Sequence, residues 1–171
     1  MNVFVRRKAE LYQWSVTSDN NEVQHHQGDL AALAAFYQEN ASVKNWVFIL
    51  DALDVACRHL SFSEKERRHI RKAIPFLLED ELLNDADELY FIHGKVQKNS
   101  VDVVAVDEQW FSQWLAELHA VGIMPTHCMA QYQLLPEKTE NLQLFFQEDV
   151  FIVRHQGQLE WAFEAQHLPL C

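Results

Sequence analysis

The sequence predicts a mixed α/β protein. Short apolar runs typical of strands alternate along the chain with segments whose apolar residues recur every three or four positions, the spacing of an α-helix. The chain has 171 residues, of which 49% are apolar, including eleven Phe and five Trp. This length and composition are sufficient for a hydrophobic core and exclude disorder over the whole chain.

The first part of the chain predicts a hairpin, a helix and two further strands. Leu11–Val16 and Glu22–Gln27 are the expected strands of the hairpin. Asp29 is placed to cap a helix, and Trp46–Leu50 is the short continuous apolar run expected of a buried central strand. Asp54–Leu60 predicts the next strand. The apolar face of the helix is formed by Leu30, Leu33, Ala34 and Tyr37.

A capping box predicts the start of a second helix. Ser63 and Glu66 have the Ser-x-x-Glu spacing of such a box. Pro75 lies inside the helical pattern, so either it kinks the helix or another helix begins there with proline in its first turn. We favour the second interpretation, because Phe76–Leu83 can form a turn or two alone. The expected inner face consists of Ile70, Ala73, Ile74, Leu77 and Leu78.

The second half predicts a hairpin followed by a third helix. Leu89–Lys95 and Val101–Val106 are the strands of the hairpin. The helix starts at Asp107 and ends at Gly122, ahead of Pro125. An aromatic stripe on this helix is either core or an exposed binding surface, and we favour the core. The stripe consists of Trp110, Phe111 and Trp114.

Three strands are expected to close the chain as a meander. They are Leu142–Phe146, Val150–Arg154 and Leu159–Phe163, with turns at 147–149 and at Gly157. The charge pattern changes near residue 86, where we place the boundary between two α/β subdomains, 1–86 and 87–171.

The net charge of −11 bears on the class of partner. Nucleic acids and anionic lipid surfaces both bind proteins through clustered Lys and Arg, so neither is the expected partner. A basic surface on another protein is the electrostatically natural one.

No motif predicts catalysis, a cofactor or a metal. The four glycines, Gly28, Gly94, Gly122 and Gly157, are too far apart to form a GxGxxG turn or a P-loop. The serines lie in no nucleophile elbow, although a triad of residues distant in sequence stays possible. We therefore predict no catalytic, cofactor-binding or metal site, and no enzyme.

Several histidines and cysteines are candidate metal ligands. His119, His127 and Cys128 are near one another and suit zinc, but we prefer an exposed His119 and a small buried Cys128. His25 and His26 would point to opposite faces of a strand. The cysteines form no disulfide framework, which fits a reducing compartment. They are Cys57, Cys128 and Cys171.

Two blocks of charge stand out. The first, here called the basic block, consists of Lys65, Arg67, Arg68, Arg71 and Lys72. The second, here called the acidic run, consists of Glu79, Asp80, Glu81, Asp85, Asp87 and Glu88. They form either a solvated helix face followed by an acidic loop or a docking surface, on which clustered charge sets orientation and association rate.

The sequence contains no predicted membrane segment. The cluster Arg6-Arg7-Lys8 is followed by no long apolar stretch, so the N-terminus does not predict a signal peptide. The longest apolar runs fall far short of the ~20 residues that a membrane helix needs.

The segment around Pro75 resembles the type II secretion system protein L family. It reads Ile74-Pro75-Phe76-Leu77-Leu78-Glu79, continues into the acidic run and ends in the strand Leu89-Tyr90-Phe91. Matches to the next helix and its exit are Trp114-Leu115-x-x-Leu118, Gly122-Ile123-x-Pro125 and Leu135-Pro136. The chain departs from the family at Leu50-Asp51-Ala52-Leu53, where a Pro-Gly-like turn is usual, and at Met129-Ala130, where Pro-Asp is usual.

The resemblance implies an actin-like ATPase (ribonuclease H-like) fold that has lost its nucleotide chemistry. It also implies a scaffold at the cytoplasmic face of the bacterial inner membrane, which recruits the N-terminal domain of the secretion ATPase and couples it to pseudopilus assembly. A homodimer and contact with the M component through regions outside this chain are implied too. Family members continue into a membrane helix and a periplasmic domain, so a fragment is expected here.

Two alternatives stay open at this point. The chain could be the related actin-like pilus-assembly protein, which binds nucleotide. It could also be an unrelated small α/β enzyme.

Overall fold

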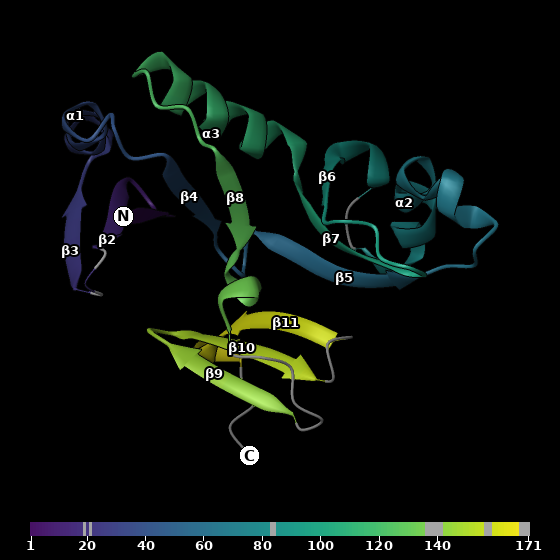
Figure 1. The fold of residues 1–171 in the computed structure, drawn as a ribbon. Helices are drawn as coiled ribbons and strands as arrows, with labels where there is room; N and C mark the ends of the chain where they lie inside the picture. Colours follow the sequence, from purple (N-terminus) through teal and green to yellow (C-terminus); the bar gives the residue numbers. More distant parts are fainter. Residues whose placement is uncertain (19, 21, 83–84, 136–141, 156–158, 168–171) are drawn as a thin grey trace. The chain divides into compact units, whose positions relative to one another are not determined.

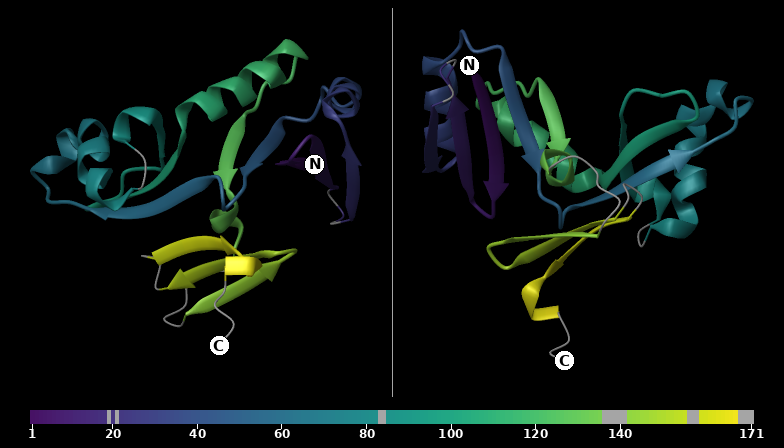
Figure 2. Two further views of the ribbon diagram at one scale, coloured as in Figure 1. Left: turned by 180° about the vertical axis from the view of Figure 1, so that it is seen from behind. Right: turned by 60° about the horizontal axis from the view of Figure 1, so that its bottom comes forward.

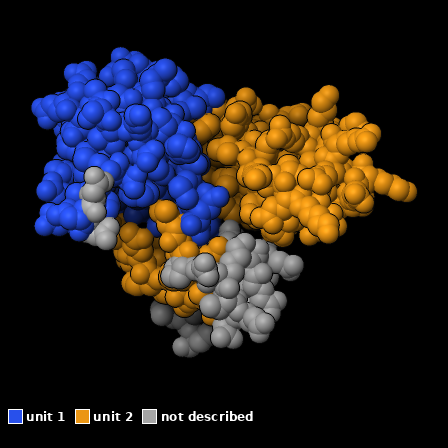
Figure 3. Space-filling model, in the orientation of Figure 1, with its two compact units in different colours: residues 1–51, 112–133 blue, residues 52–111, 134–171 orange. Residues whose placement is uncertain are grey.

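The structure is a computed structural model that describes residues 1–18, 20, 22–82, 85–135, 142–155 and 159–167. Within these residues the strands form three sheets (Figure 1). Contacts between Cα atoms divide the chain into two compact units (Figure 3). Unit 1 comprises 1–51 and 112–133, and unit 2 comprises 52–111 and 134–171. The boundary expected at residue 86 lies inside unit 2, so the two divisions of the chain differ.

Unit 1 contains a five-stranded mixed sheet in the order β3-β2-β1-β4-β8. Its strands β1, β2 and β3 are antiparallel neighbours, whereas β4 is parallel to both β1 and β8. The bounds are Asn2–Lys8 for β1, Leu11–Thr17 for β2, Val23–Gly28 for β3, Asn45–Leu50 for β4 and His127–Ala130 for β8. The predicted hairpin and central strand are confirmed.

Strands β1 and β8 were not predicted. In β1, Val3 and Val5 alternate with outward residues and are fully buried, but the cluster from Arg6 to Lys8 conceals this strand in the sequence. Strand β8 has only four residues, and one of them, His127, is exposed. Its strand conformation depends on parallel pairing with β4, which is distant in sequence.

Helix α1 (Leu30–Glu39) begins where the sequence predicts. The Asp29 carboxylate accepts a hydrogen bond from the backbone N–H of Ala32 at 2.8 Å, as an N-cap does. Leu33 and Ala34 are buried as expected, and the Phe36 ring contacts the rings of aromatic residues on the sheet. Burial of this apolar face fixes the helix on the sheet.

Helix α3 (Glu108–Ala120) supplies one of the large aromatic side chains of the unit 1 core. Asp107 caps it, accepting a hydrogen bond from the backbone N–H of Trp110 at 2.7 Å. The Trp114 side chain is 1% exposed, and its indole N–H donates to the Tyr12 hydroxyl at 3.2 Å. Its ring also packs against Phe48. The predicted core role of Trp114 is confirmed.

A glycine ends α3. Gly122 has φ +81°, and its N–H donates to the carbonyl of His119 while that of Ile123 donates to Leu118, the Schellman arrangement. We expect Gly122→Ala to lower the free energy of unfolding by about 1–2 kcal/mol, because a side chain is disfavoured at this φ. Chemical denaturation followed by circular dichroism measures the change.

The matched control is Gly94→Ala. Gly94 lacks a positive φ, and an added Cβ would meet only ordinary contacts, the nearest 3.6 Å away. This variant should be as stable as the original or slightly more so. Equal losses in both variants would contradict the role given to Gly122.

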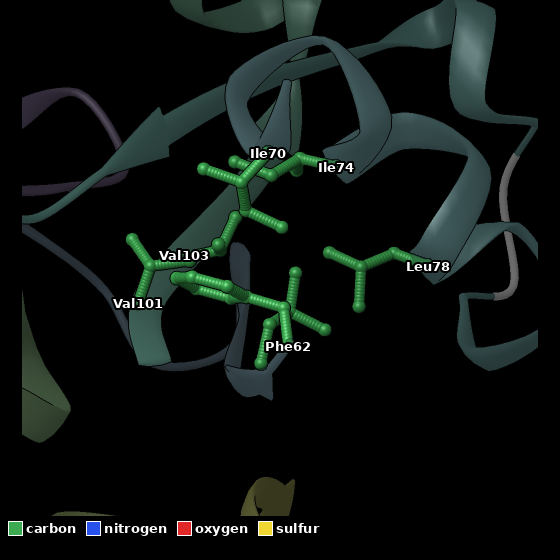
Figure 4. Packing of buried hydrophobic residues seen from close by; sticks show 7 residues of the cluster. Phe62, Ile70, Ile74, Leu78, Val101 and Val103 are labelled. Atoms are coloured by element: carbon green, nitrogen blue, oxygen red, sulfur yellow. The ribbon is translucent and has the colours of Figure 1, made fainter. Parts of the chain in front are cut away.

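Unit 2 contains a second sheet, β5-β7-β6, in which neighbouring strands are antiparallel. The bounds are Val55–Ser61 for β5, Leu89–His93 for β6 and Ser100–Asp107 for β7. Helix α2 (Ile70–Leu78) packs its buried side chains against this sheet (Figure 4). The core cluster consists of Leu60, Phe62, Ile70, Ile74, Leu78, Val101 and Val103.

Two predictions about α2 are wrong. The helix runs through Pro75 instead of restarting there. Burial of Ile70, Ile74 and Leu78 forms one continuous stripe across the proline, and this burial outweighs the loss of a single backbone hydrogen bond. Leu77 was assigned to the inner face but is 45% exposed, because that stripe is only one residue wide per turn.

Unit 2 also contains the third sheet, β11-β10-β9, which confirms the predicted meander. Figure 2 shows this sheet from two further directions. Its strands are Gln143–Gln147 (β9), Val150–His155 (β10) and Leu159–Glu164 (β11). The turn expected at Gly157 lies outside the described residues. Short 3₁₀ helices complete the chain: Glu66–Arg68 (η1), Glu79–Glu81 (η2), Ala86–Glu88 (η3), Gln131–Leu134 (η4) and Ala165–His167 (η5).

No helix in the described part of the chain is long and apolar enough to span a membrane.

Candidate docking surface

The acidic run lies on two short 3₁₀ helices between α2 and β6. Helix η2 continues directly from α2, and η3 precedes β6, with the backbone N–H of Glu88 donating to the Asp85 carbonyl at 2.9 Å. All six acidic side chains are exposed. The burial of α2 and the pairing of β6 with β7 therefore hold these carboxylates at the surface of unit 2.

Arg58 on β5 holds the start of the acidic run. Its Nε lies 3.3 Å from Oε2 of Glu81, and its Nη2 donates to the Glu81 carbonyl at 3.0 Å. Among the described residues, Glu81 is the only member of the acidic run that forms an ion pair. The other carboxylates of the run are not neutralised within the described part of the chain.

A cleft of about 360 Å³ lies beside this ion pair. Arg58 and Glu81 line it together with the apolar side chains of Leu53, Leu82 and Leu89. The remaining lining residues are Asp54, Val55, Ala56, Ala105, Val106 and Asp107. The cleft thus combines an apolar wall with carboxylates, a chemistry that suits the stem and head of a long basic side chain.

The basic block lies on η1, the residue before it and the first half of α2. All five of its side chains are exposed, and none of them pairs with an acid in the part of the chain that the structure describes. The predicted capping box is only half formed: a Glu66 carboxylate oxygen accepts hydrogen bonds from the Ser63 N–H and hydroxyl, both at 2.7 Å, but the Glu66 N–H donates to the Ser63 carbonyl. The prediction that it opens the helix is wrong, since only the short helix η1 follows it and α2 begins at Ile70. These hydrogen bonds lower the pKa of Glu66.

The carboxyl ends of the parallel strands β1 and β4 hold an internal ion pair. Two nitrogens of Arg6 donate to Oδ2 of Asp51, at 2.6 and 3.1 Å, and both side chains are mostly buried. Strand β1 ends in Arg6-Arg7-Lys8 and contains no Asp-x-Gly sequence. Arg6 and Asp51 therefore neutralise each other. The described residues form no glycine-rich phosphate loop.

The three candidate zinc ligands are not assembled into one ligand group with further acids, histidines or cysteines among the described residues. His119 and His127 are both exposed, and Cys128 is half-buried on β8. No group of three or more potential ligands is assembled among the described residues. His25 instead shares a hydrogen bond with the Ser15 hydroxyl, and the His26 ring stacks on Trp14.

Burial raises the pKa of the Cys128 thiol to about 11. Because the thiolate is the reactive form, we expect slow alkylation of Cys128 by iodoacetamide in the folded protein near pH 8. The rate should rise as the pH increases toward 11. Mass spectrometry of the peptide containing Cys128 measures the rate, with the urea-unfolded chain as the control. Equal rates in both states would contradict a buried, protonated thiol.

Two features of this region were not predicted from the sequence. The partnership of Arg58 with Glu81 joins residues far apart in the chain, and no local pattern signals it. The Phe76 side chain is 77% exposed, and no prediction was made for it. Its position two residues after Ile74, on the side of the helix away from the inner face, is the signal that could have indicated this exposure.

Comparison with known proteins identifies relatives over nearly the whole chain. The model of the family described as type II secretion system (T2SS), protein L, matches residues 4–171. A protein L from Pectobacterium carotovorum subsp. carotovorum is 26% identical over 156 residues, which cover 88% of this chain and 36% of that protein. One from Vibrio cholerae serotype O1 is 25% identical over 167 residues, covering 96% of this chain and 41% of that protein.

Two solved structures share the fold. The cytoplasmic domain of EpsL, an inner membrane component of the type II secretion system of Vibrio cholerae, superposes with a TM-score of 0.75 and 25% identity, over 97% of this chain and 72% of that chain. The PilM–PilN type IV pilus biogenesis complex gives a TM-score of 0.63 at 15% identity, over 95% of this chain and 61% of that chain. The mixed α/β, actin-like fold expected for the chain is confirmed. The chain itself spans about two fifths of the curated relatives' length.

Proposed function

Because the chain belongs to the type II secretion system protein L family, we propose that it forms the cytoplasmic part of an inner-membrane platform component and recruits the secretion ATPase. The solved relative in Vibrio cholerae is a cytoplasmic domain of such an inner membrane component. In this role the domain binds the N-terminal domain of the ATPase and couples ATP turnover to pseudopilus assembly and export.

The proposal rests on the exposure of the acidic run and on how few of its carboxylates form ion pairs within the described residues. Its carboxylates are exposed at the surface of unit 2, and only Glu81 is paired within the described residues. Unneutralised charge on one face steers a partner of opposite charge and sets its orientation. We therefore propose the acidic run as the surface on which a basic face of the ATPase N-terminal domain docks.

The remaining partners of the platform are proposed from family membership. Protein M is reached through regions outside this chain, and a second copy of protein L completes a homodimer. The membrane is reached through a helix that also lies outside this chain. In this proposal the domain is a scaffold without catalysis or cofactor, and the enzyme is the recruited ATPase.

A second candidate function is nucleotide binding, favoured by the likeness to the fold of a pilus biogenesis complex. The Arg6–Asp51 ion pair at the ends of β1 and β4 favours the scaffold instead. A thermal shift with Mg-ATP separates the two, because the scaffold is expected to show none. The hypothesis of an unrelated small enzyme is set aside by the family match over residues 4–171.

The test of recruitment is a pull-down at low salt. The immobilised chain should retain the N-terminal domain of the cognate secretion ATPase and release it as the salt concentration rises, since screening weakens exposed charge pairs. The ATPase without its N-terminal domain is the matched control and should not bind. Failure to retain the intact ATPase would remove the basis of the proposal.

A further inference from the structure

The cleft of unit 2 lies on the same face of the sheet β5-β7-β6 as α2. Leu60 of β5 and Val101 of β7 pair across the strands and belong to the core cluster under α2. Ala56 and Ala105 form the cross-strand pair four residues away along each strand, on the same face, because side chains alternate with a period of two. Both alanines line the cleft of about 360 Å³. Their small side chains leave the space that the cleft occupies.

Three leucines form the apolar part of the cleft. Leu53 lies before β5, Leu82 follows η2, and Leu89 is the first residue of β6. Leu53 is 43% exposed, and the other two side chains are partly buried. A ligand that covers these side chains removes their apolar surface from water, which favours its binding.

The charged side chains of the cleft have an excess of negative charge. Three carboxylates, those of Asp54, Glu81 and Asp107, line it with one guanidinium, that of Arg58. Arg58 pairs with Glu81, its Nε lying 3.3 Å from Oε2. One oxygen of Asp107 accepts the hydrogen bond that caps α3, which orients this carboxylate at the end of β7. The described residues that line the cleft include no second cation.

This combination of charge and apolar surface restricts the ligand. An anionic ligand, such as a phosphate or a nucleotide, would face three carboxylates and be repelled. A purely apolar ligand would remove those carboxylates from water without giving them a hydrogen-bond donor. A Lys or Arg side chain meets both requirements, since its methylene stem packs against leucines while its charged head binds carboxylates.

We propose that this cleft is a pocket for one long basic side chain of the secretion ATPase, presented by the N-terminal domain that docks on the acidic run. Glu81 belongs both to the acidic run and to the cleft, so the pocket is continuous with the proposed docking surface. The stem of the bound side chain lies against the three leucines, and its head binds the carboxylates of Asp54 and Asp107. Such an anchor contributes more to affinity than the exposed charges around it.

The source of the side chain rests on the proposed recruitment of the ATPase, whereas the chemistry of the pocket does not. The pocket is therefore tested once without the ATPase and once with it.

The experiment without the ATPase is a titration of the chain with Nα-acetyl-arginine N-methylamide, followed by nuclear magnetic resonance of the leucine methyl groups. The methyl resonances of Leu53, Leu82 and Leu89 should shift and saturate at millimolar concentrations of this probe. The citrulline derivative has nearly the same shape without the charge, so it should bind at least about tenfold more weakly. Absence of saturable shifts, or equal affinities for the two derivatives, would overturn the proposal without the use of any variant.

The second experiment fills the pocket without changing any charge. Ala56→Leu places a larger side chain in the cleft, and Ala56 is only partly buried, so the variant should keep the circular dichroism spectrum of the original chain. It should abolish the methyl shifts caused by the arginine derivative. In isothermal titration it should bind the ATPase N-terminal domain at least about tenfold more weakly than the original chain.

The matched control is Ala35→Leu, the same substitution at an exposed position of α1 in unit 1. It should leave both the methyl shifts and the affinity for the ATPase domain unchanged. If the original chain binds the ATPase domain and Ala56→Leu binds it equally well, the cleft is not the anchor site, although recruitment stands. If neither chain binds the ATPase domain, recruitment itself fails, and the methyl shifts alone decide whether the cleft takes a basic side chain.

Discussion

Replacing Trp114 by alanine is expected to lower the free energy of unfolding by about 3–5 kcal/mol, the range for deletion of a large buried aromatic side chain. The Trp114 side chain is 1% exposed, packs against Phe48 and donates a hydrogen bond to the Tyr12 hydroxyl. Its removal opens a cavity between α3 and the sheet of unit 1 and leaves the buried hydroxyl without that donor. Urea unfolding followed by far-ultraviolet circular dichroism measures the loss.

The matched control for this variant is Trp161→Ala. Trp161 is 48% exposed on β11, so the same truncation should cost no more than about 1 kcal/mol. A loss in the control equal to that of Trp114→Ala would show that Trp114 is not a principal core residue of unit 1.

Reversing three carboxylates of the acidic run is expected to weaken binding of the ATPase N-terminal domain by about 10- to 100-fold at low salt. The substitutions are Glu79→Lys, Asp85→Lys and Asp87→Lys. They avoid Glu81, whose ion pair with Arg58 belongs to the fold of unit 2, so the variant should remain folded. Isothermal titration gives the dissociation constants.

A control with the same change of net charge separates local docking from general attraction. Glu10, Glu22 and Glu39 are exposed acids of unit 1, and their reversal to Lys changes the total charge equally. This variant should bind the ATPase domain within about threefold of the original chain, because it leaves the short-range charge pairs of the acidic run intact. If both variants lose affinity to the same degree, the ATPase domain is attracted by the overall negative charge of the chain, and the acidic run is not a specific docking surface.

The sequence predicts the local features of this fold well and the distant ones poorly. Asp29, Asp107 and Gly122 were identified from signals within a few residues, because helix capping is a local interaction. The sequence did not predict that residues 112–133 belong to unit 1. Their strand β8 pairs with β4 in a sheet that begins at the N-terminus. Pairing between distant strands leaves no local pattern when one partner is as short as β8.

The candidate site shows the same division. The acidic run and the basic block can be recognised in the sequence as clusters of like charge. Their exposure follows because the amphipathic helix α2 between them buries only its apolar face. Which charges remain unpaired depends on tertiary structure. Arg58 forms an ion pair with Glu81, and nothing in the sequence around either residue indicates this pair. Leu77 was placed on the inner face by helical period alone, but the width of the buried stripe is set by the sheet that α2 covers.

The central claim, that the acidic run is the docking surface for the secretion ATPase, is tested most directly by hydrogen exchange. Backbone amides of the chain are compared with and without a saturating amount of the ATPase N-terminal domain. Exchange should slow in peptides that contain Glu79–Glu81 and Ala86–Glu88, and it should be unchanged in the edge strand Val23–Gly28 of unit 1. Unchanged exchange in both acidic peptides, with protection elsewhere in a bound complex, would contradict the account.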